Sequence, residues 1–116
     1  MVNRAVVLLR YREPAVRWIN EADPDPDAVP TTLDAANRER TAYLISDADA
    51  EDHATLRRWI EDNFRGLWEE ELEGWYTDET LWPEHRTLKK FDEWFDVECH
   101  TVVLDTVGTE ILDDEV

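Results

Sequence analysis

The chain has 116 residues, with 29 Asp and Glu against 12 Lys and Arg, so its formal net charge at pH 7 is −17. This excess of negative charge disfavours nucleic acid and anionic membrane surfaces as direct ligands. Hydrophobic residues make up 42% of the sequence, which is too much for a disordered chain.

Length and cysteine content set further limits. A chain of this size is expected to form one domain, residues 1–116, and to bury a core without a metal or a disulfide. The single cysteine, Cys99, excludes an internal disulfide and is typical of a reducing compartment. No apolar run approaches the ~20 residues that span a bilayer. The sequence therefore predicts a cytoplasmic protein without a membrane segment.

The first half of the chain predicts two strands and one helix. Residues 4–12 contain five consecutive apolar residues, which is typical of a central strand buried on both faces. Residues 14–22 predict a short helix, since proline suits a first helical turn. The run DPDPDAVP at 23–30 indicates a surface linker. One helical turn over 33–37 and a second strand over 41–46 follow.

The second half predicts two helices and one strand. Apolar residues recur at three- and four-residue steps over 56–72, so a long amphipathic helix is expected there, closed by Gly74 in a left-handed conformation. The acidic residues at 69–73 are expected mostly to face water. Trp82-Pro83 indicates a further helix over 83–95. Residues 99–107 predict the third strand, and 108–116 an acidic, frayed tail.

These elements predict an α+β fold, a small three-stranded sheet covered by helices in the order β-α-β-α-α-β. The order of the strands within the sheet stays open. Residues 59–96 contain nine of the twelve aromatic residues, including five of the six tryptophans. So much aromatic area forms either the core or a binding surface.

Several stretches resemble a family of small uncharacterised bacterial proteins. They are EPAVRWI after the first strand, TAYLI in the second, and the aromatic block GWYTDETLWPEHRTLKKFDEWFDVE. The similarity covers residues 4–106. It implies a compact α+β fold with a small sheet and packed helices, and it implies no activity, because the family has no established function.

The best candidate for a binding site is the aromatic loop at 75–82. Trp75, Tyr76 and Trp82 offer rigid, amphipathic area of the kind that is enriched in binding hot spots, and Asp78 lies between them. The alternative is that these rings belong to the core, where large aromatic residues usually lie.

A second candidate is the positive cluster within the acidic region, formed by Arg86, Lys89 and Lys90. Arg86 and the free amides of the helix start could hold a carboxylate or a phosphate. The alternative is simple neutralisation of the acidic residues around them.

The sequence predicts no metal, no cofactor and no catalytic residue. His53, His85 and His100 share no ligand spacing, and Cys99 and His100 point to opposite faces of a strand. A phosphate loop, a dinucleotide fingerprint and the hydrolase nucleophile motif are all missing from the sequence.

Two classes of function remain. The first is a non-catalytic protein-interaction or regulatory module, which uses the aromatic loop on an acidic body to bind an unknown protein partner or a second copy of itself. The alternative is a small-ligand-binding protein or small enzyme with a pocket near Trp82 and Arg86, to which Asp78, Glu79 and His85 would contribute. An acidic mimic of nucleic acid is a third candidate, whose binding would fail at high salt.

Overall fold

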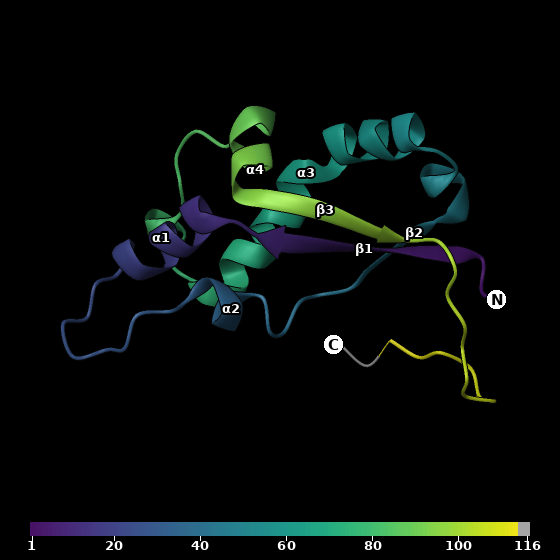
Figure 1. The fold of residues 1–116 in the computed structure, drawn as a ribbon, viewed down its shortest axis with the longest axis horizontal. Helices are drawn as coiled ribbons and strands as arrows, with labels where there is room; N and C mark the ends of the chain where they lie inside the picture. The colour runs from purple at the N-terminus through teal and green to yellow at the C-terminus, as the bar shows by residue number, and fades with distance from the viewer. Residues whose placement is uncertain (114–116) are drawn as a thin grey trace.

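The computed structural model describes residues 1–113 and has the predicted α+β fold (Figure 1). In chain order its elements are β1 (Arg4–Tyr11), α1 (Glu13–Glu21), α2 (Leu33–Ala36), β2 (Tyr43–Ser46), the 3₁₀ turn η1 (Asp47–Ala50), α3 (His53–Trp75), the 3₁₀ turn η2 (Glu79–Leu81), α4 (Leu88–Trp94) and β3 (Phe95–His100). The short helix α2 occupies the place where the sequence predicts one helical turn.

The sheet has the strand order β2-β1-β3, and both strand pairs are antiparallel. β1 is therefore central, as its apolar run predicts. Burial alternates along it, however: Val7 is fully buried, whereas Val6 and Leu8 are only half-buried. The predicted burial on both faces is wrong, because helices pack on the Val7 face alone. An apolar run of five residues does not reveal whether a second layer covers the sheet.

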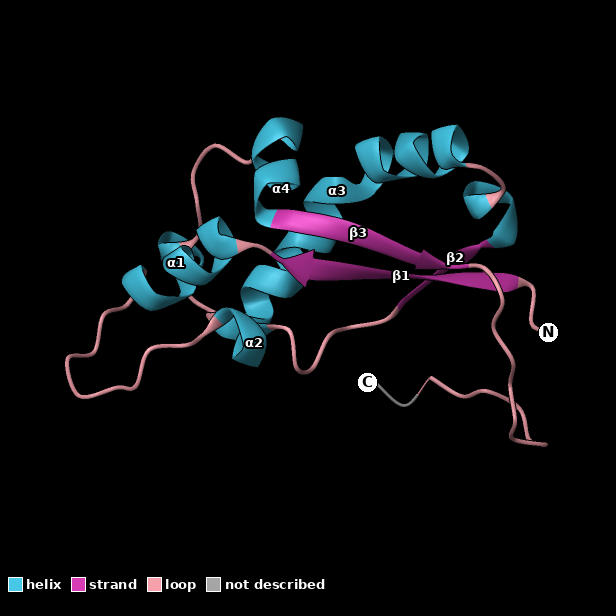
Figure 2. Cartoon of the chain, viewed as in Figure 1, coloured by secondary structure: helices cyan, strands magenta, loops and turns pink. Residues whose placement is uncertain are grey.

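Residues 59–96 supply most of the aromatic rings in the core between the sheet and α3, the helix that crosses behind the strands in Figure 2. Trp68, in α3, is completely buried. Its ring centroid lies 5.2 Å from that of Trp94, 5.9 Å from that of Phe91 and 6.2 Å from that of Phe95. Aromatic pairs of this kind contribute about 0.5–1.5 kcal/mol each beyond the burial of their area.

The start of the last helix differs from the prediction. α4 begins at Leu88 rather than at Pro83, so the predicted helix over 83–95 is wrong for its first turn. The Thr87 side chain caps α4 by accepting a hydrogen bond from the Lys90 amide at 3.2 Å. Threonine satisfies an otherwise unpaired amide in this way, and this local signal prevails over the proline.

The third strand also lies earlier than predicted. β3 covers Phe95–His100, so the predicted strand over 99–107 is wrong in position. Its first residue is buried against Tyr11, with ring centroids 5.2 Å apart, and the two residues face each other in the β1–β3 register. This contact starts the strand directly after α4 and leaves Val102 and Leu104 exposed.

The end of α3 determines where one tryptophan points. Gly74 lies within α3, which continues to Trp75 and gives way to extended backbone at Tyr76. The predicted left-handed glycine is wrong, since none of the described glycines has a positive φ. Trp75 therefore projects from a helix, one turn after Glu71, and not from a loop.

Two segments lie outside the sheet and helices. Residues 23–30 form an exposed loop between α1 and α2. Residues 108–113 are exposed and have no regular structure, while the rest of the predicted tail, 114–116, falls outside the described residues. Within residues 1–113, none of the helices combines the length and the apolar character needed to cross a bilayer.

Candidate functional site

Glu71 is a carboxylate buried in the interior of the molecule. It projects from α3 and is only 9% exposed. The Tyr11 hydroxyl on β1 donates to Glu71 Oε1 at 2.7 Å, and the Tyr43 hydroxyl on β2 donates to Oε2 at 2.5 Å. Among the described residues no Lys, Arg or His forms an ion pair with this carboxylate. A buried carboxylate held by neutral donors alone is costly unless another charge compensates it.

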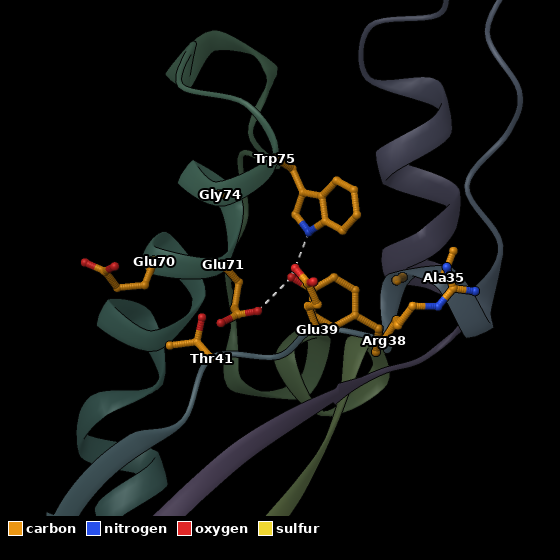
Figure 3. Close-up of a pocket in the computed structure, with 10 residues that line it drawn as sticks. Ala35, Arg38, Glu39, Thr41, Glu70, Glu71, Gly74 and Trp75 are labelled. Atoms are coloured by element: carbon orange, nitrogen blue, oxygen red, sulfur yellow. Dashed lines mark hydrogen bonds between the residues drawn. The ribbon is translucent and has the colours of Figure 1, made fainter.

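A tryptophan extends this network. Trp75 Nε1 donates to the Tyr11 hydroxyl at 2.9 Å, so the order of donors runs from Trp75 through Tyr11 to Glu71 (Figure 3). Each member fixes the orientation of the next, and the Glu71 carboxylate is held from two strands at once. Four side chains from three elements thus form a preorganised polar cluster.

The two phenols are held in their protonated form. Burial, and then the charge of Glu71, raise the pKa of Tyr11 far above its usual range. Burial, and then the hydrogen bond to Glu71, raise the pKa of Tyr43 in the same direction. Both phenols therefore remain donors at any physiological pH, and the cluster is suited to holding a negative charge in place.

The cluster opens into a cavity of about 430 Å³, within the range of about 300–1,000 Å³ that small-molecule sites occupy. Its lining combines carboxylates, aromatic rings and small residues: Tyr11, Ala35, Ala36, Arg38, Glu39, Thr41, Glu70, Glu71, Gly74 and Trp75. Three carboxylates and one guanidinium thus line the cavity, and in Figure 3 the Arg38 head group and the Glu70 carboxylate both point away from Glu71. The cavity is therefore acidic and suits a positively charged group.

Glu71 retains capacity for a further ligand. An ionised carboxylate offers about four acceptor positions on its two oxygens. The two phenols occupy two of them, so each oxygen keeps a position for another donor. An ammonium or guanidinium group would find charged acceptors here, and the Trp75 ring supplies an aromatic surface for it.

The predicted aromatic loop is used mainly for internal packing. The Tyr76 hydroxyl donates to the Ile19 carbonyl at 2.5 Å, and Trp82 Nε1 donates to the Tyr76 carbonyl at 2.8 Å. Trp18 packs edge-on against Tyr76 with ring centroids 5.4 Å apart. These contacts tie the loop to α1 and give the Tyr76 hydroxyl and the Trp82 indole N–H internal partners.

Trp75 and Tyr76 nevertheless border open space. Together they line a second cavity, of about 230 Å³, which includes Asp23 and Asp25 from the 23–30 loop. Trp75 thus lines two cavities, both of which contain carboxylates.

The other predicted site residues lie elsewhere. Arg86 Nη1 donates to the Pro83 carbonyl at 2.9 Å, its Nη2 lies 3.4 Å from Glu69 Oε1, and its guanidinium lies 5.8 Å from the Trp82 ring centroid. Lys89 is exposed on α4. None of these residues lines the cavity at Glu71.

Asp78 has a local structural role. Its carboxylate accepts hydrogen bonds from the Thr80 hydroxyl at 2.6 Å and from the Thr80 amide at 3.0 Å, and these bonds lower the pKa of Asp78. Asp78 thereby caps the turn η2. It does not line the cavity at Glu71 either.

The sequence prediction misses the centre of the site. Glu71 is expected to face water with its acidic neighbours, and that expectation is wrong, because it falls on the buried stripe of α3 seven residues after Phe64 and one before Leu72. A carboxylate at that helical phase is the signal that could have identified it. Tyr11 and Tyr43 carry no such signal, because their approach to Glu71 depends on strand pairing.

Two further kinds of site, a metal centre and a reactive thiol, depend on the positions of the His, Cys, Asp and Glu side chains. Among residues 1–113, no three His, Cys, Asp or Glu side chains converge in a way that could hold a metal ion. Cys99 is half-buried in β3, and burial raises the pKa of its thiol, which lowers the thiolate fraction that a nucleophile needs.

Comparison of the chain with protein-family models, with curated proteins and with solved structures finds no match. The resemblance to a family of small bacterial proteins therefore stays a prediction. The function has to be inferred from the chemistry of the site itself.

Proposed function

We propose that this chain is a non-catalytic interaction module that takes the Lys or Arg side chain of a partner protein into the cavity at Glu71. The observation that carries the proposal is the buried Glu71 carboxylate, which two phenols orient and which no cation of the described residues neutralises. A basic group from a partner would supply the missing positive charge.

Electrostatics favour a basic ligand at two ranges. At long range, a net charge of −17 attracts cations and accelerates their encounter with the protein. At short range, a hydrogen bond to a charged, partly desolvated carboxylate contributes about 1.5–3 kcal/mol. Contact of the cation with the Trp75 ring adds about 0.5–2 kcal/mol.

The second cavity favours a protein partner over a small amine. It shares Trp75 with the first cavity and carries Asp23 and Asp25. Two neighbouring acidic cavities around one tryptophan suit a peptide with two basic residues, whereas a single amine would use only one of them. In this way the aromatic loop contributes Trp75 and Tyr76 to binding, while its remaining rings keep the surface rigid.

The protonation of the two phenols supports a non-catalytic role. Both phenols that contact Glu71 have strongly raised pKa values, so neither transfers its proton near neutral pH. General acid–base catalysis requires a group whose pKa lies near the working pH. We place the protein in the cytoplasm, where the unpaired thiol of Cys99 would stay reduced.

The test is a binding titration with short peptides that contain paired lysines or arginines, followed by the indole fluorescence of the protein. We expect Glu71→Gln to weaken binding by about tenfold, the equivalent of about 1.4 kcal/mol. Glu73→Gln is the matched control, because Glu73 carries the same charge on the same helix but is exposed and does not line the cavity. Binding that is equally weakened by both variants would contradict the proposal.

Two further probes separate the possible ligands. Peptides with norleucine or citrulline in place of the basic residues should not bind, since they retain the shape and lose the charge. Spermidine tests the small-ligand alternative. If spermidine binds in a Glu71-dependent manner and the peptides do not, the protein is a small-amine-binding protein rather than an interaction module.

A further inference from the structure

The helices leave one face of the sheet uncovered. According to the strand register, this face is formed by Arg4, Val6, Leu8 and Arg10 of β1, Leu44 and Ser46 of β2, and Asp96, Glu98 and His100 of β3. The apolar side chains lie along its middle, where Val6 pairs with Leu44. Leu44 is 55% exposed, although it lies in a strand.

Further apolar residues gather at the end of this face. Beyond β3 the chain runs past the N-terminal segment and turns back (Figure 1), and the Val2 amide donates to the Val103 carbonyl at 2.9 Å. A cavity of about 490 Å³ lies there, lined by Val2, Asn3, Arg4, Leu44, Val103, Leu104, Asp105 and Ile111. Leu104 and Ile111 are each 68% exposed. Contiguous exposed apolar area of this kind marks an interaction surface.

The charges of the uncovered face are nearly balanced, in contrast to the rest of the molecule. Arg10 and Arg40 both approach Glu98, at 4.0 Å and 2.9 Å. With Arg4, Asp96 and the Asp105 of the cavity added, three arginines stand against three carboxylates here, whereas the chain as a whole carries −17. Two copies of this chain repel each other through their other surfaces, but not through this one.

The arrangement of these charges is also self-complementary. Arg4 and Arg10 lie along the central strand, and Asp96 and Glu98 lie along the edge strand β3. A two-fold axis brings the same patch of two copies together. When that axis runs between β1 and β3 and parallel to them, β1 of one copy lies over β3 of the other, and Arg10 of each copy faces Asp96 of the other. A basic partner, by contrast, would be drawn to the acidic surfaces elsewhere.

We propose that a second copy of this chain docks on the uncovered face, and that the two copies form a symmetric dimer that buries Leu44, Leu104 and Ile111. The observations behind this inference do not involve the cavity at Glu71, and the dimer leaves that cavity free because it lies on the helix-covered side of the sheet. The dimer would therefore present two binding sites.

The test is sedimentation equilibrium of the full chain over a wide range of concentrations, at low and at high salt. The monomer mass is 13.7 kDa. We expect a reversible transition to twice this mass, and we expect tighter association at high salt, since salt screens the repulsion between two acidic copies. A chain that stays monomeric at millimolar concentration in both salts would overturn the proposal, as would open-ended assembly in place of a dimer.

Two variants locate the interface. Leu104→Asp and Leu44→Asp should each weaken the dimer by tenfold or more. Val29→Asp is the control for added charge, because Val29 is 91% exposed and lies in the 23–30 loop. Equal weakening by Leu104→Asp and Val29→Asp would place the contact elsewhere and overturn the assignment. Since Leu104 lies outside every helix and strand, its result decides the question even if Leu44→Asp unfolds the protein.

Discussion

Trp68 and Glu71 lie three residues apart on the same buried stripe of α3, yet their surroundings are opposite. Trp68 is completely buried among the rings of Phe91, Trp94 and Phe95. Glu71 is surrounded by hydroxyl groups and borders an open cavity. One helix thus supplies a closed apolar core at its centre and a polar, accessible cluster one turn later.

The difference shows how a small domain separates stability from binding. Rings can pack against each other in many orientations, so the aromatic region forms a buried cluster. A carboxylate and two phenols must keep hydrogen-bond geometry, and this requirement leaves room beside them. The two regions meet at Tyr11, whose ring contacts Phe95 and whose hydroxyl contacts Glu71.

The largest effect is expected at the aromatic end of this pair. Trp68→Ala should lower the free energy of unfolding by about 3–5 kcal/mol, since it leaves a large cavity in the core. Trp68→Phe should cost clearly less, because it keeps a ring and removes an indole N–H that has no hydrogen-bond partner among the described residues. Denaturant unfolding of both variants measures the difference. Equal losses would show that the ring itself contributes little.

Breaking the polar end should cost less stability. Tyr11→Phe removes one donor from Glu71 and leaves the Trp75 indole without its acceptor. Unsatisfied buried groups cost about 1–3 kcal/mol, so we expect a loss in that range. Tyr76→Phe is a suitable comparison, since the Tyr76 hydroxyl donates to a backbone carbonyl and not to a charge. A Tyr11→Phe variant as stable as the parent would contradict the described network.

Alkaline pH should weaken the polar end of this pair. The pKa of Tyr11 and the pKa of Tyr43 are raised in the folded state, so the unfolded chain releases these protons first. Stability from this source is complete below about pH 10, the usual tyrosine pKa, and falls as the pH rises above it. For Tyr11 the slope is at most about 1.4 kcal/mol per pH unit.

Denaturant unfolding between pH 9 and pH 11.5 measures this slope. The variant Tyr11→Phe/Tyr43→Phe should show a flatter decline than the parent, because it lacks both titrating phenols. All other titratable groups are the same in the two proteins, so the comparison cancels their contribution. Parallel declines in the two proteins would mean that the phenols are not protected by the fold.

Hydrophobic periodicity in the sequence predicts most of the helices and strands. The features that it does not predict depend on tertiary contacts between side chains. The stripe of apolar residues locates α3, and the apolar run of β1 places that strand at the centre of the sheet. The start of β3 is not predicted because the strand propensity of residues 101–104 favours a strand further along the chain. In the structure the contact of Phe95 with Tyr11 makes the strand begin at Phe95.

The candidate site is predicted only in part, for a related reason. Trp75 stands out in the sequence because tryptophan is rare and large. Glu71 is hidden among acidic neighbours that face water, and only its helical phase distinguishes it. Tyr11 and Tyr43 reach it because β1 and β2 pair side by side in front of α3, and the sequence leaves the order of the strands open.

The smallest effect is expected at Asp92, a carboxylate that, unlike Glu71, is exposed and forms an ion pair with an arginine. Arg57 on α3 donates two hydrogen bonds to Asp92 on α4, at 2.9 Å and 2.5 Å. The two side chains are 35% and 42% exposed. Exposed ion pairs contribute about 0–1 kcal/mol. Asp92→Asn should therefore lower the free energy of unfolding by less than about 1 kcal/mol, and the loss should shrink at 1 M salt, where the screening length is about 3 Å. Measured beside Glu71→Leu, which leaves the hydroxyls of Tyr11 and Tyr43 without their acceptor, this variant compares the loss of an exposed carboxylate with the loss of a buried one. If Asp92→Asn lowered the free energy of unfolding more than Glu71→Leu did, the ranking would be reversed, and the exposed ion pair would be the more important charge interaction of α3.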